Sequence, residues 1–388
     1  MRGDWNYPTR IRFGAGRLAE IASVLAETGV ERPLIVTDPG LAGLPMLAEL
    51  SRHCANAARG AICFADSSPN PVGADVDAGA RIFRETDRDG VIAIGGGSAI
   101  DVGKAIALVA HQDHPLWQFE DVGDNWTRAD SARIAPTVAI PTTAGTGSEV
   151  GRSSVIIDEE ATRKVIVFHP AMLPVQVICD PVLTRSLPPH LTAATGMDAL
   201  SHSLEAFCAR GFHPMADGIA VEGMRLVAAH LEDATAQGDN LDARSGMLAA
   251  SLMGATAFQK GLGAMHAMAH PIGAALGAHH GLINAVLMPY VIARNRPAIE
   301  SRLTQLAVAL ELPGGGYEAV QDWILELRAR LSIPHTVEAL GVTEANLDML
   351  AKAAAIDPAG GGNPIALTAA DYRTLLGDAL RGSLSSSA

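Results

Sequence analysis

The sequence predicts an α/β N-terminal half with a largely parallel sheet, followed by an all-α C-terminal half. Short β-branched runs alternate with amphipathic helical stretches up to about residue 183, which is typical of βαβ units. From residue 191 onward, apolar residues recur with the 3.6-residue period of helices, and no comparable β-run appears. Prolines at positions 181, 188 and 189 interrupt the chain between the two patterns. We therefore expect one domain over residues 1–183 and a second over residues 184–388.

The elements of the first half follow from local patterns. Apolar, mostly β-branched clusters predict strands over residues 34–37, 61–64, 91–94, 137–140, 154–157, 165–168 and 175–178. Helical periodicity predicts helices over residues 44–54 and 76–88, and a third that opens after Gly97. Pro45 suits the first turn of the first of these helices, because that turn needs no N–H from it.

The second half reads as long helices rich in Ala, Leu and Met. The clearest segments are residues 191–209, 215–231, 241–258 and 282–293. Their lengths exceed those of the first-half helices, which fits a domain built from helices alone.

Composition excludes several classes of protein. The chain has 388 residues with 29 Lys and Arg against 42 Asp and Glu, a net charge of −13, which argues against nucleic acid or an anionic membrane as partner. Four cysteines lack any C-x-x-C pair, so we expect no disulfide framework and a reducing compartment. The N-terminus lacks a signal-peptide pattern and no uncharged apolar stretch reaches spanning length. We expect a cytoplasmic protein.

A glycine triplet marks a candidate phosphate cradle. Gly95, Gly96 and Gly97 follow a predicted strand and lead through Ser98 into a helix that contains Asp101. Glycines let the backbone approach a ligand closely, and the first N–H groups of the helix then face an anion such as a dinucleotide pyrophosphate. Glycine-rich turns also occur for packing reasons, and both interpretations stay open.

Two further features favour a dinucleotide. Asp38 follows a predicted strand, where a carboxylate binds the adenosine ribose and repels a 2′-phosphate, so NAD is favoured over NADP. A cap on the following helix is the alternative role for Asp38. The loop after the strand at 137–140 offers Thr142, Thr143 and Thr146 as hydroxyl donors, although an ordinary polar turn uses the same residue types.

Carboxylate and imidazole side chains in the second half predict a metal site. Asp198 and His202 are four residues apart, as are His266 and His270, so each pair lies on one face of a helix. His280 and its neighbour His279 follow a Gly/Ala-rich connection. Buried imidazoles need partners, and a carboxylate with three imidazoles suits Fe²⁺ or Zn²⁺ better than Mg²⁺ or Ca²⁺. For any one of these histidines taken alone, a structural role is the alternative to metal binding.

With these motifs in view, the chain resembles the iron-containing (group III) alcohol dehydrogenases over essentially its full length. The matching segments are Gly95 to Ser98 with Asp101 and Lys104, the loop from 141 to 149, residues 195–199 with His202 and Glu205, and residues 261–281 with His266, His270 and His280. In particular, the chain resembles the 4-hydroxybutyrate dehydrogenase branch at residues 257–263, at His279-His280 and at residues 370–373.

The resemblance implies a Rossmann-like NAD-binding domain, a helical metal-binding domain, and a cleft between them where the nicotinamide meets the metal. It implies Asp198, His202, His266 and His280 as ligands of Fe²⁺, with Zn²⁺ as the alternative metal. Cofactor positions carried over are Asp38, Asn70, Gly97, Ser98, Thr142, Thr143 and Lys164; Gly96, Asp101 and Thr146 belong to the same motifs. His270 matches a histidine beside the metal, and we expect it to relay the proton.

The expected activity is reversible hydride transfer between NAD(H) and a small primary alcohol or its aldehyde, in a homodimer or larger homo-oligomer. Arg152, with its neighbour Ser153, and Lys260 are candidates for binding the acid group of a substrate such as 4-hydroxybutyrate. The alternative is that Arg152 and Lys260 are solvated or paired with Glu149 and Glu205. Reduction of another small carbonyl compound, such as lactaldehyde or maleylacetate, and a dehydroquinate synthase-like lyase remain competing functions.

Overall fold

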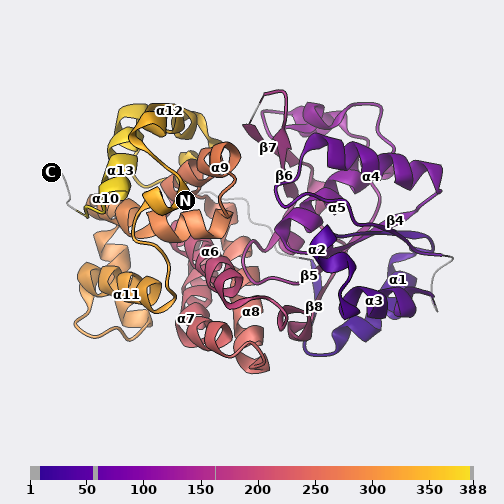
Figure 1. The fold of residues 1–388 in the computed structure, drawn as a ribbon, viewed down its shortest axis with the longest axis horizontal. Coiled ribbons are helices and arrows are strands. Elements are labelled where there is room, and N and C mark those ends of the chain that lie inside the picture. Colours follow the sequence, from indigo (N-terminus) through magenta and orange to yellow (C-terminus); the bar gives the residue numbers. More distant parts are fainter. Residues whose placement is uncertain (1–8, 56–59, 162, 385–388) are drawn as a thin grey trace. The chain divides into compact units, whose positions relative to one another are not determined.

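A computed structural model describes residues 9–55, 60–161 and 163–384. Internal contacts divide the chain into two compact units, one that ends at Ser186 and one that begins at Leu187 (Figure 1). The first unit is α/β and the second is helical, which confirms the predicted fold class. That these units act as an NAD-binding domain and a catalytic domain stays a prediction.

The core of the first unit is a six-stranded sheet in which all neighbouring strands run parallel. Its order is β1 (Arg10–Phe13), β8 (Gln176–Cys179), β5 (Thr137–Pro141), β4 (Gly90–Gly95), β2 (Pro33–Val36) and β3 (Ile62–Phe64). Five of these strands lie within one or two residues of their predicted bounds. Strand β1 was not predicted, because its sequence R-I-R-F alternates charged and apolar residues over only four positions.

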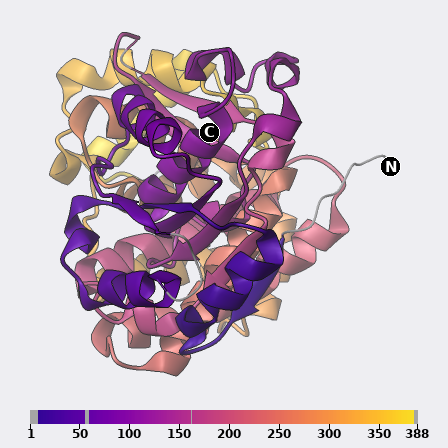
Figure 2. The same ribbon diagram turned by 90° about the vertical axis from the view of Figure 1, so that its right-hand side faces the viewer.

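Helices cover both faces of this sheet (Figures 1 and 2). Helices α1 (Ile21–Thr28) and α3 (Pro45–Ala55) bury one face, and α4 (Gly73–Glu85) and α5 (Gly97–Val109) bury the other. Alternate residues of β4 divide accordingly, with Ile92 and Ile94 in the α1/α3 core and Val91 and Ala93 in the α4/α5 core. Because every central strand is covered on both sides, its residues form the continuous apolar runs that predicted them.

Two predicted strands form a separate hairpin. Strands β6 (Ser153–Asp158) and β7 (Arg163–Phe168) pair antiparallel with each other and lie outside the parallel sheet. The hairpin contributes Ile156, Val165 and Val167 to the α4/α5 core. Its alternating pattern identified the strands, but such a pattern does not say which sheet a strand joins.

The second unit contains eight α-helices among its described residues. They are α6 (Pro189–Cys208), α7 (Pro214–Ala236), α8 (Leu241–Ala257), α9 (Ala264–Leu276), α10 (His280–Ala309), α11 (Gly316–Arg330), α12 (Leu347–Ile356) and α13 (Ala369–Arg381). Four of them contain the predicted helical segments.

Helix α10 is much longer than the predicted segment 282–293, and Pro289 and Pro297 lie inside it. A proline leaves the carbonyl four residues earlier without its helical N–H partner. The buried guanidinium of Arg328 donates to the carbonyls of Ala285 and Val286, which replaces part of the lost hydrogen bonding around Pro289. A contact from a distant helix therefore lets α10 continue through its proline.

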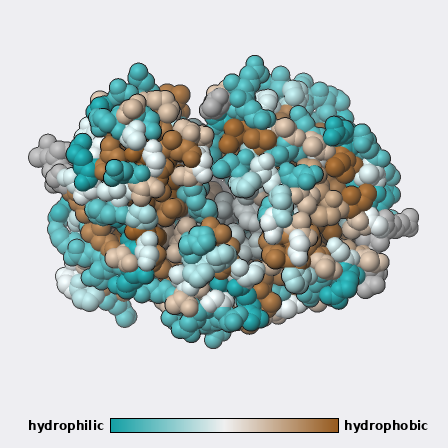
Figure 3. All heavy atoms as spheres, in the orientation of Figure 1, coloured by the Kyte–Doolittle hydropathy of each residue, from teal (hydrophilic) through white to brown (hydrophobic). Residues whose placement is uncertain are grey.

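None of the helices in the described ranges combines the length and apolarity that crossing a membrane requires. On the face seen in Figure 3, hydrophilic residues are mixed with smaller groups of hydrophobic ones.

Candidate functional site

Three helices of the second unit, α6, α9 and α10, bring the predicted metal ligands together. Asp198 and His202 lie on α6, His266 lies on α9, and all three side chains are buried. Their potential ligand atoms all lie within 4.8 Å of one another. The rings of His202 and His266 stack with centroids 4.8 Å apart. A buried carboxylate and two imidazoles at this spacing form a donor set suited to a divalent transition metal.

His280, the first residue of α10, lies beside this cluster. Its Nε2 is 3.7 Å from Oδ1 of Asp198, and its ring centroid is 5.3 Å from that of His266. Gly281 allows this approach, because a Cβ at that position would collide with the carbonyl oxygen of Ala194 on α6. The four predicted ligands therefore lie together, and their role as ligands stays a prediction.

Glu205, one turn after His202 on α6, holds the start of α9. Its carboxylate accepts hydrogen bonds from the backbone N–H groups of Gly263 and Met265, at 2.8 and 2.7 Å, and from Nδ1 of His266 at 2.7 Å. Burial lowers the pKa of His266, but the neighbouring carboxylates, first of all Glu205, outweigh it and leave that pKa raised. The helix that carries His266 is thus anchored by side-chain bonds.

His270, the predicted proton relay, has a carboxylate partner. Its Nδ1 lies 2.9 Å from Oδ2 of Asp357, and its ring stacks on that of His280 with centroids 5.6 Å apart. Because a carboxylate is an acceptor, the Nδ1 of His270 carries the proton in this pair. Nε2 is then the ring nitrogen available to exchange a proton.

In the first unit, the predicted cofactor residues gather at the carboxyl ends of the central strands. A Cβ atom added to Gly97 would lie 2.5 Å from Oγ1 of Thr146, and one added to Gly96 would lie 3.5 Å from the methyl group of Thr143. A Cβ atom added to Gly95 would lie 3.4 Å from Oδ2 of Asp38. The loops after β2, β4 and β5 therefore meet, which is where ligands bind in parallel sheets of this kind.

The remaining cofactor candidates lie around these loops. The hydroxyl of Ser98 donates to the carbonyl of Pro69, the residue before Asn70. Thr142 is buried, and its N–H donates to the carbonyl of Gly95. Lys164, on β7, pairs across the hairpin with Ile157, whose N–H donates to the carbonyl of Pro71. The Asn70 segment and the hairpin are thus in contact.

Several of these side chains also serve the fold. Oδ1 of Asp38 accepts from the N–H of Leu41 and caps α2 (Pro39–Ala42), the alternative considered above. Asp101 is buried, and its carboxylate contacts the Ser148 hydroxyl, the N–H of Val155 at 2.9 Å and Nζ of Lys104 at 3.1 Å. Asp101 therefore joins α5 to the segments around β6, and these contacts favour a structural role for it.

Glu149, considered above only as an ion-pair partner for Arg152 or Lys260, is buried. Its side chain lies in the η5 turn after the threonine-rich loop, and Oε1 has no hydrogen-bond partner among the described residues. Burial raises the pKa of Glu149 to about 7, although Lys104 opposes this effect.

The candidate substrate residues have other contacts. Nζ of Lys260 is buried and forms an ion pair with Asp217 at 2.5 Å, so its partner is not the Glu205 considered above. Asp217 also pairs with Arg302 at 2.8 Å. The guanidinium of Arg152 lies 5.5 Å from the ring centre of Phe168, and the carbonyl of its neighbour Ser153 accepts from Lys104. These contacts favour the structural alternative for Lys260.

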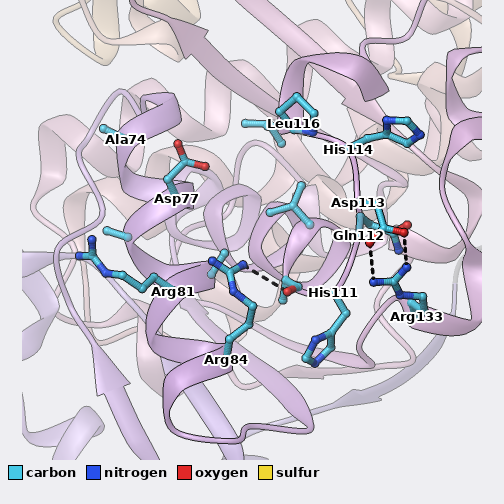
Figure 4. A pocket seen from close by; sticks show the side chains of 15 residues that line it. Ala74, Asp77, Arg81, Arg84, His111, Gln112, Asp113, His114, Leu116 and Arg133 are labelled. Carbon is cyan, nitrogen blue, oxygen red and sulfur yellow. Dashed lines mark hydrogen bonds and ion pairs between the residues drawn. The ribbon is translucent and has the colours of Figure 1, made fainter.

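A separate hollow of about 950 Å³ lies between α4 and the segment after α5 (Figure 4). Its charged side chains largely bond to each other or to backbone: Arg133 pairs with Asp113, and Arg84 donates to the carbonyl of Ala110. None of the predicted site residues lines it.

Comparison with known proteins gives a consistent picture. The sequence model described as iron-containing alcohol dehydrogenase matches residues 8–181, and the model described as the C-terminal part of the Fe-containing alcohol dehydrogenase family matches residues 192–380. A 4-hydroxybutyrate dehydrogenase of Cupriavidus necator is 39% identical over 95% of this chain and 98% of its own length.

Solved structures agree. A 1,3-propanediol oxidoreductase superposes with a TM-score of 0.93 at 32% identity, covering 98% of this chain and 100% of that one. A sulfoacetaldehyde reductase from Bifidobacterium kashiwanohense, solved in complex with NAD⁺, gives a TM-score of 0.89 at 31% identity, covering 98% and 99% of the two chains.

Proposed function

Because the chain belongs to the iron-containing alcohol dehydrogenase family, we propose that it interconverts a small primary alcohol and its aldehyde with NAD(H) and a divalent cation. The observation that carries the proposal is the buried cluster of Asp198, His202 and His266, whose ligand atoms lie within 4.8 Å of one another. With His280 beside it, the donor set fits a divalent transition metal. We propose Fe²⁺ as the native metal, with Zn²⁺ as its competitor for the same donors.

The chemistry divides between the bound groups and the chain. A divalent cation supplies Lewis acidity to the alcohol or carbonyl oxygen, and NAD(H) exchanges the hydride. Asp198, His202, His266 and His280 would hold the cation. His270, whose Nδ1 is held by Asp357, would take the alcohol proton on Nε2 during oxidation and return it during reduction.

For the dinucleotide, we propose that the first N–H groups of α5, at Gly97 and Ser98, bind the pyrophosphate. Oδ1 of Asp38 is engaged by Leu41, so Oδ2 is the oxygen that would accept from the adenosine ribose. A carboxylate there would also disfavour the 2′-phosphate of NADP. Thr142, Thr143, Thr146, Asn70 and Lys164 would complete the cradle.

For the substrate, we propose a short hydroxy acid such as 4-hydroxybutyrate. Two of the relatives above are named for compounds that carry an acid group. Nζ of Lys260 is already bonded to Asp217 and to the carbonyl of Phe207, so Arg152 is the better candidate to bind that group. Arg152→Gln should then lower kcat/KM for the hydroxy acid more than for the matching alcohol, whereas Lys260→Met should leave the ratio within about twofold and lower Tm.

The deciding experiment follows NADH absorbance with the Fe²⁺-loaded protein and compares 4-hydroxybutyrate with 1-butanol. We expect kcat/KM to favour the hydroxy acid by roughly tenfold or more, which corresponds to about 1.4 kcal/mol. Equal values would contradict acid recognition but leave the alcohol dehydrogenase activity intact. No absorbance change with any alcohol or aldehyde, metal being bound, would contradict the activity itself. We also propose a homodimer or larger assembly, which light scattering tests.

A further inference from the structure

A chain of hydrogen bonds links the proposed metal ligands to two residues outside the ligand set. Nδ2 of Asn284, on α10, lies 2.8 Å from Oδ1 of Asp198 and 3.2 Å from Nε2 of both His266 and His280. On its other ring nitrogen, His266 is bonded to Glu205. All of these side chains except that of His280 are buried. The connected order is therefore Glu205, His266, Asn284 and Asp198.

The first link decides which nitrogen of His266 carries the proton. The Glu205 carboxylate already accepts two backbone N–H groups of α9, so it presents acceptor oxygens to that helix. Nδ1 of His266 therefore carries a proton, and in the neutral ring Nε2 then keeps its lone pair. The lone pair on Nε2 is the one that faces Asp198 and Asn284, which is the form a metal ligand requires.

The second link decides the orientation of the Asn284 amide. With Nδ2 toward the cluster, an amide N–H of Asn284 donates to Oδ1 of Asp198. With the amide turned over, Oδ1 of Asn284 would face the Asp198 carboxylate, which is repulsive. The observed orientation leaves Oδ1 buried and without a partner among the described residues, so the contacts of Nδ2 are what hold it.

We propose that Glu205 and Asn284 are positioning residues of the metal centre: Glu205 holds the His266 ring by Nδ1 so that Nε2 faces the cation site, and Asn284 holds the Asp198 carboxylate by Oδ1. This inference rests on the proposed function, because it requires that the cluster bind a cation. Neither residue donates a ligand atom. Each acts through the ligand it bonds, and its loss should weaken metal binding without removing a ligand.

The test uses the whole protein freed of metal and titrated with Co²⁺, whose visible absorption reports the ligand geometry. For both Glu205→Gln and Asn284→Ala we expect the dissociation constant to rise about 10- to 100-fold and the visible bands to shift. Gln can turn its NH₂ group toward His266 and favour the wrong tautomer, and Ala leaves Asp198 without its donor. Thermal denaturation of the metal-free variants checks that each one folds.

Two matched controls separate positioning from general stability. Tyr290→Phe removes a buried hydroxyl on α10 that donates to the carbonyl of His335 rather than to a proposed ligand. Glu222→Gln removes an exposed carboxylate of α7 that pairs with Arg225. We expect both controls to bind Co²⁺ within about twofold of the parent and with its spectrum, even where Tm falls.

The outcomes distinguish this inference from the proposed function. If the parent protein binds no Co²⁺, the metal-dependent function fails and the inference falls with it. If the parent binds and the two variants bind equally well with unchanged spectra, only the positioning role is overturned. Should Glu205→Gln fail to fold, the Asn284→Ala variant decides by itself, because Glu205 still anchors the start of α9 in that variant.

Discussion

The two candidate sites hold their residues in different ways. In the helical unit, Asp198, His202 and His266 converge through side chains, and hydrogen bonds hold Asp198 to Asn284 and His266 to Glu205. In the α/β unit, glycines and threonines bring loop backbones together, while Asp38 and Asp101 bond within the fold. A cation needs side-chain donors, whereas a pyrophosphate is bound largely by backbone N–H groups. Side-chain identity therefore predicts function better in the first site than in the second.

The largest effect should follow loss of a proposed ligand. His266→Ala removes one imidazole, so we expect little retained metal and a fall in kcat/KM of about three orders of magnitude or more, because the cation contributes several kcal/mol. Metal content and NADH formation measure both. His230→Ala, at a half-buried histidine of α7 outside the proposed ligand set, is the control. If His266→Ala kept its full metal content and turnover, His266 would not be a ligand, and the contrast between the two sites would no longer hold.

A buried charge in the α/β unit gives the next effect. Burial raises the pKa of Glu149 to about 7 from an ordinary 4.5, so the folded state binds this proton more tightly than the unfolded state. Its stability contribution is complete below about pH 4.5 and is lost as the pH rises to about 7. The loss is about 3 kcal/mol.

Glu149→Gln should therefore gain stability relative to the parent as the pH rises from 5 to 8. Denaturation of both proteins at each pH checks this, since all other titrating groups are shared. A stability difference that stays constant with pH would show that Glu149 is ionised in the folded protein at all of these pH values.

The glycine loop gives a smaller effect on cofactor binding. Gly97→Ala places a methyl group 2.5 Å from Oγ1 of Thr146, so the loop must shift at a cost of about 1–3 kcal/mol. We expect KM for NAD to rise roughly tenfold or more, with little change in metal content. Gly43→Ala is the control, because its Cβ would have open space. An unchanged KM would contradict the proposal that α5 binds the pyrophosphate.

The smallest effect separates two roles of Asp38. Asp38→Ser keeps an oxygen that can cap α2 but removes the charge, whereas Asp38→Ala removes both and costs about 1 kcal/mol of stability. If Asp38 binds the ribose, both variants should lose several-fold preference for NAD over NADP. If only Asp38→Ala has an effect, Asp38 serves only as the cap of α2. Steady-state kinetics with both cofactors decide between these results.

Sequence reasoning reached the fold and most of the site because both depend on local spacing. Apolar runs revealed the central strands, and fixed helical spacing placed Asp198 and His202 on one face. The contacts of His266 and His270 with Glu205 and Asp357 span 61 and 87 residues, and local patterns carry no such information. Asn284 lies four residues after His280, so the same spacing rule was a usable signal for it. Nothing local distinguishes Asp357 from an ordinary turn residue.

The central claim is that one divalent cation binds among Asp198, His202, His266 and His280. Anomalous diffraction from crystals of the Fe²⁺-loaded protein, recorded on both sides of the iron absorption edge, tests it most directly. We expect one strong iron peak per chain, about 2 Å from donor atoms of these four residues. A peak elsewhere in the chain, or no peak in fully loaded crystals, would contradict it.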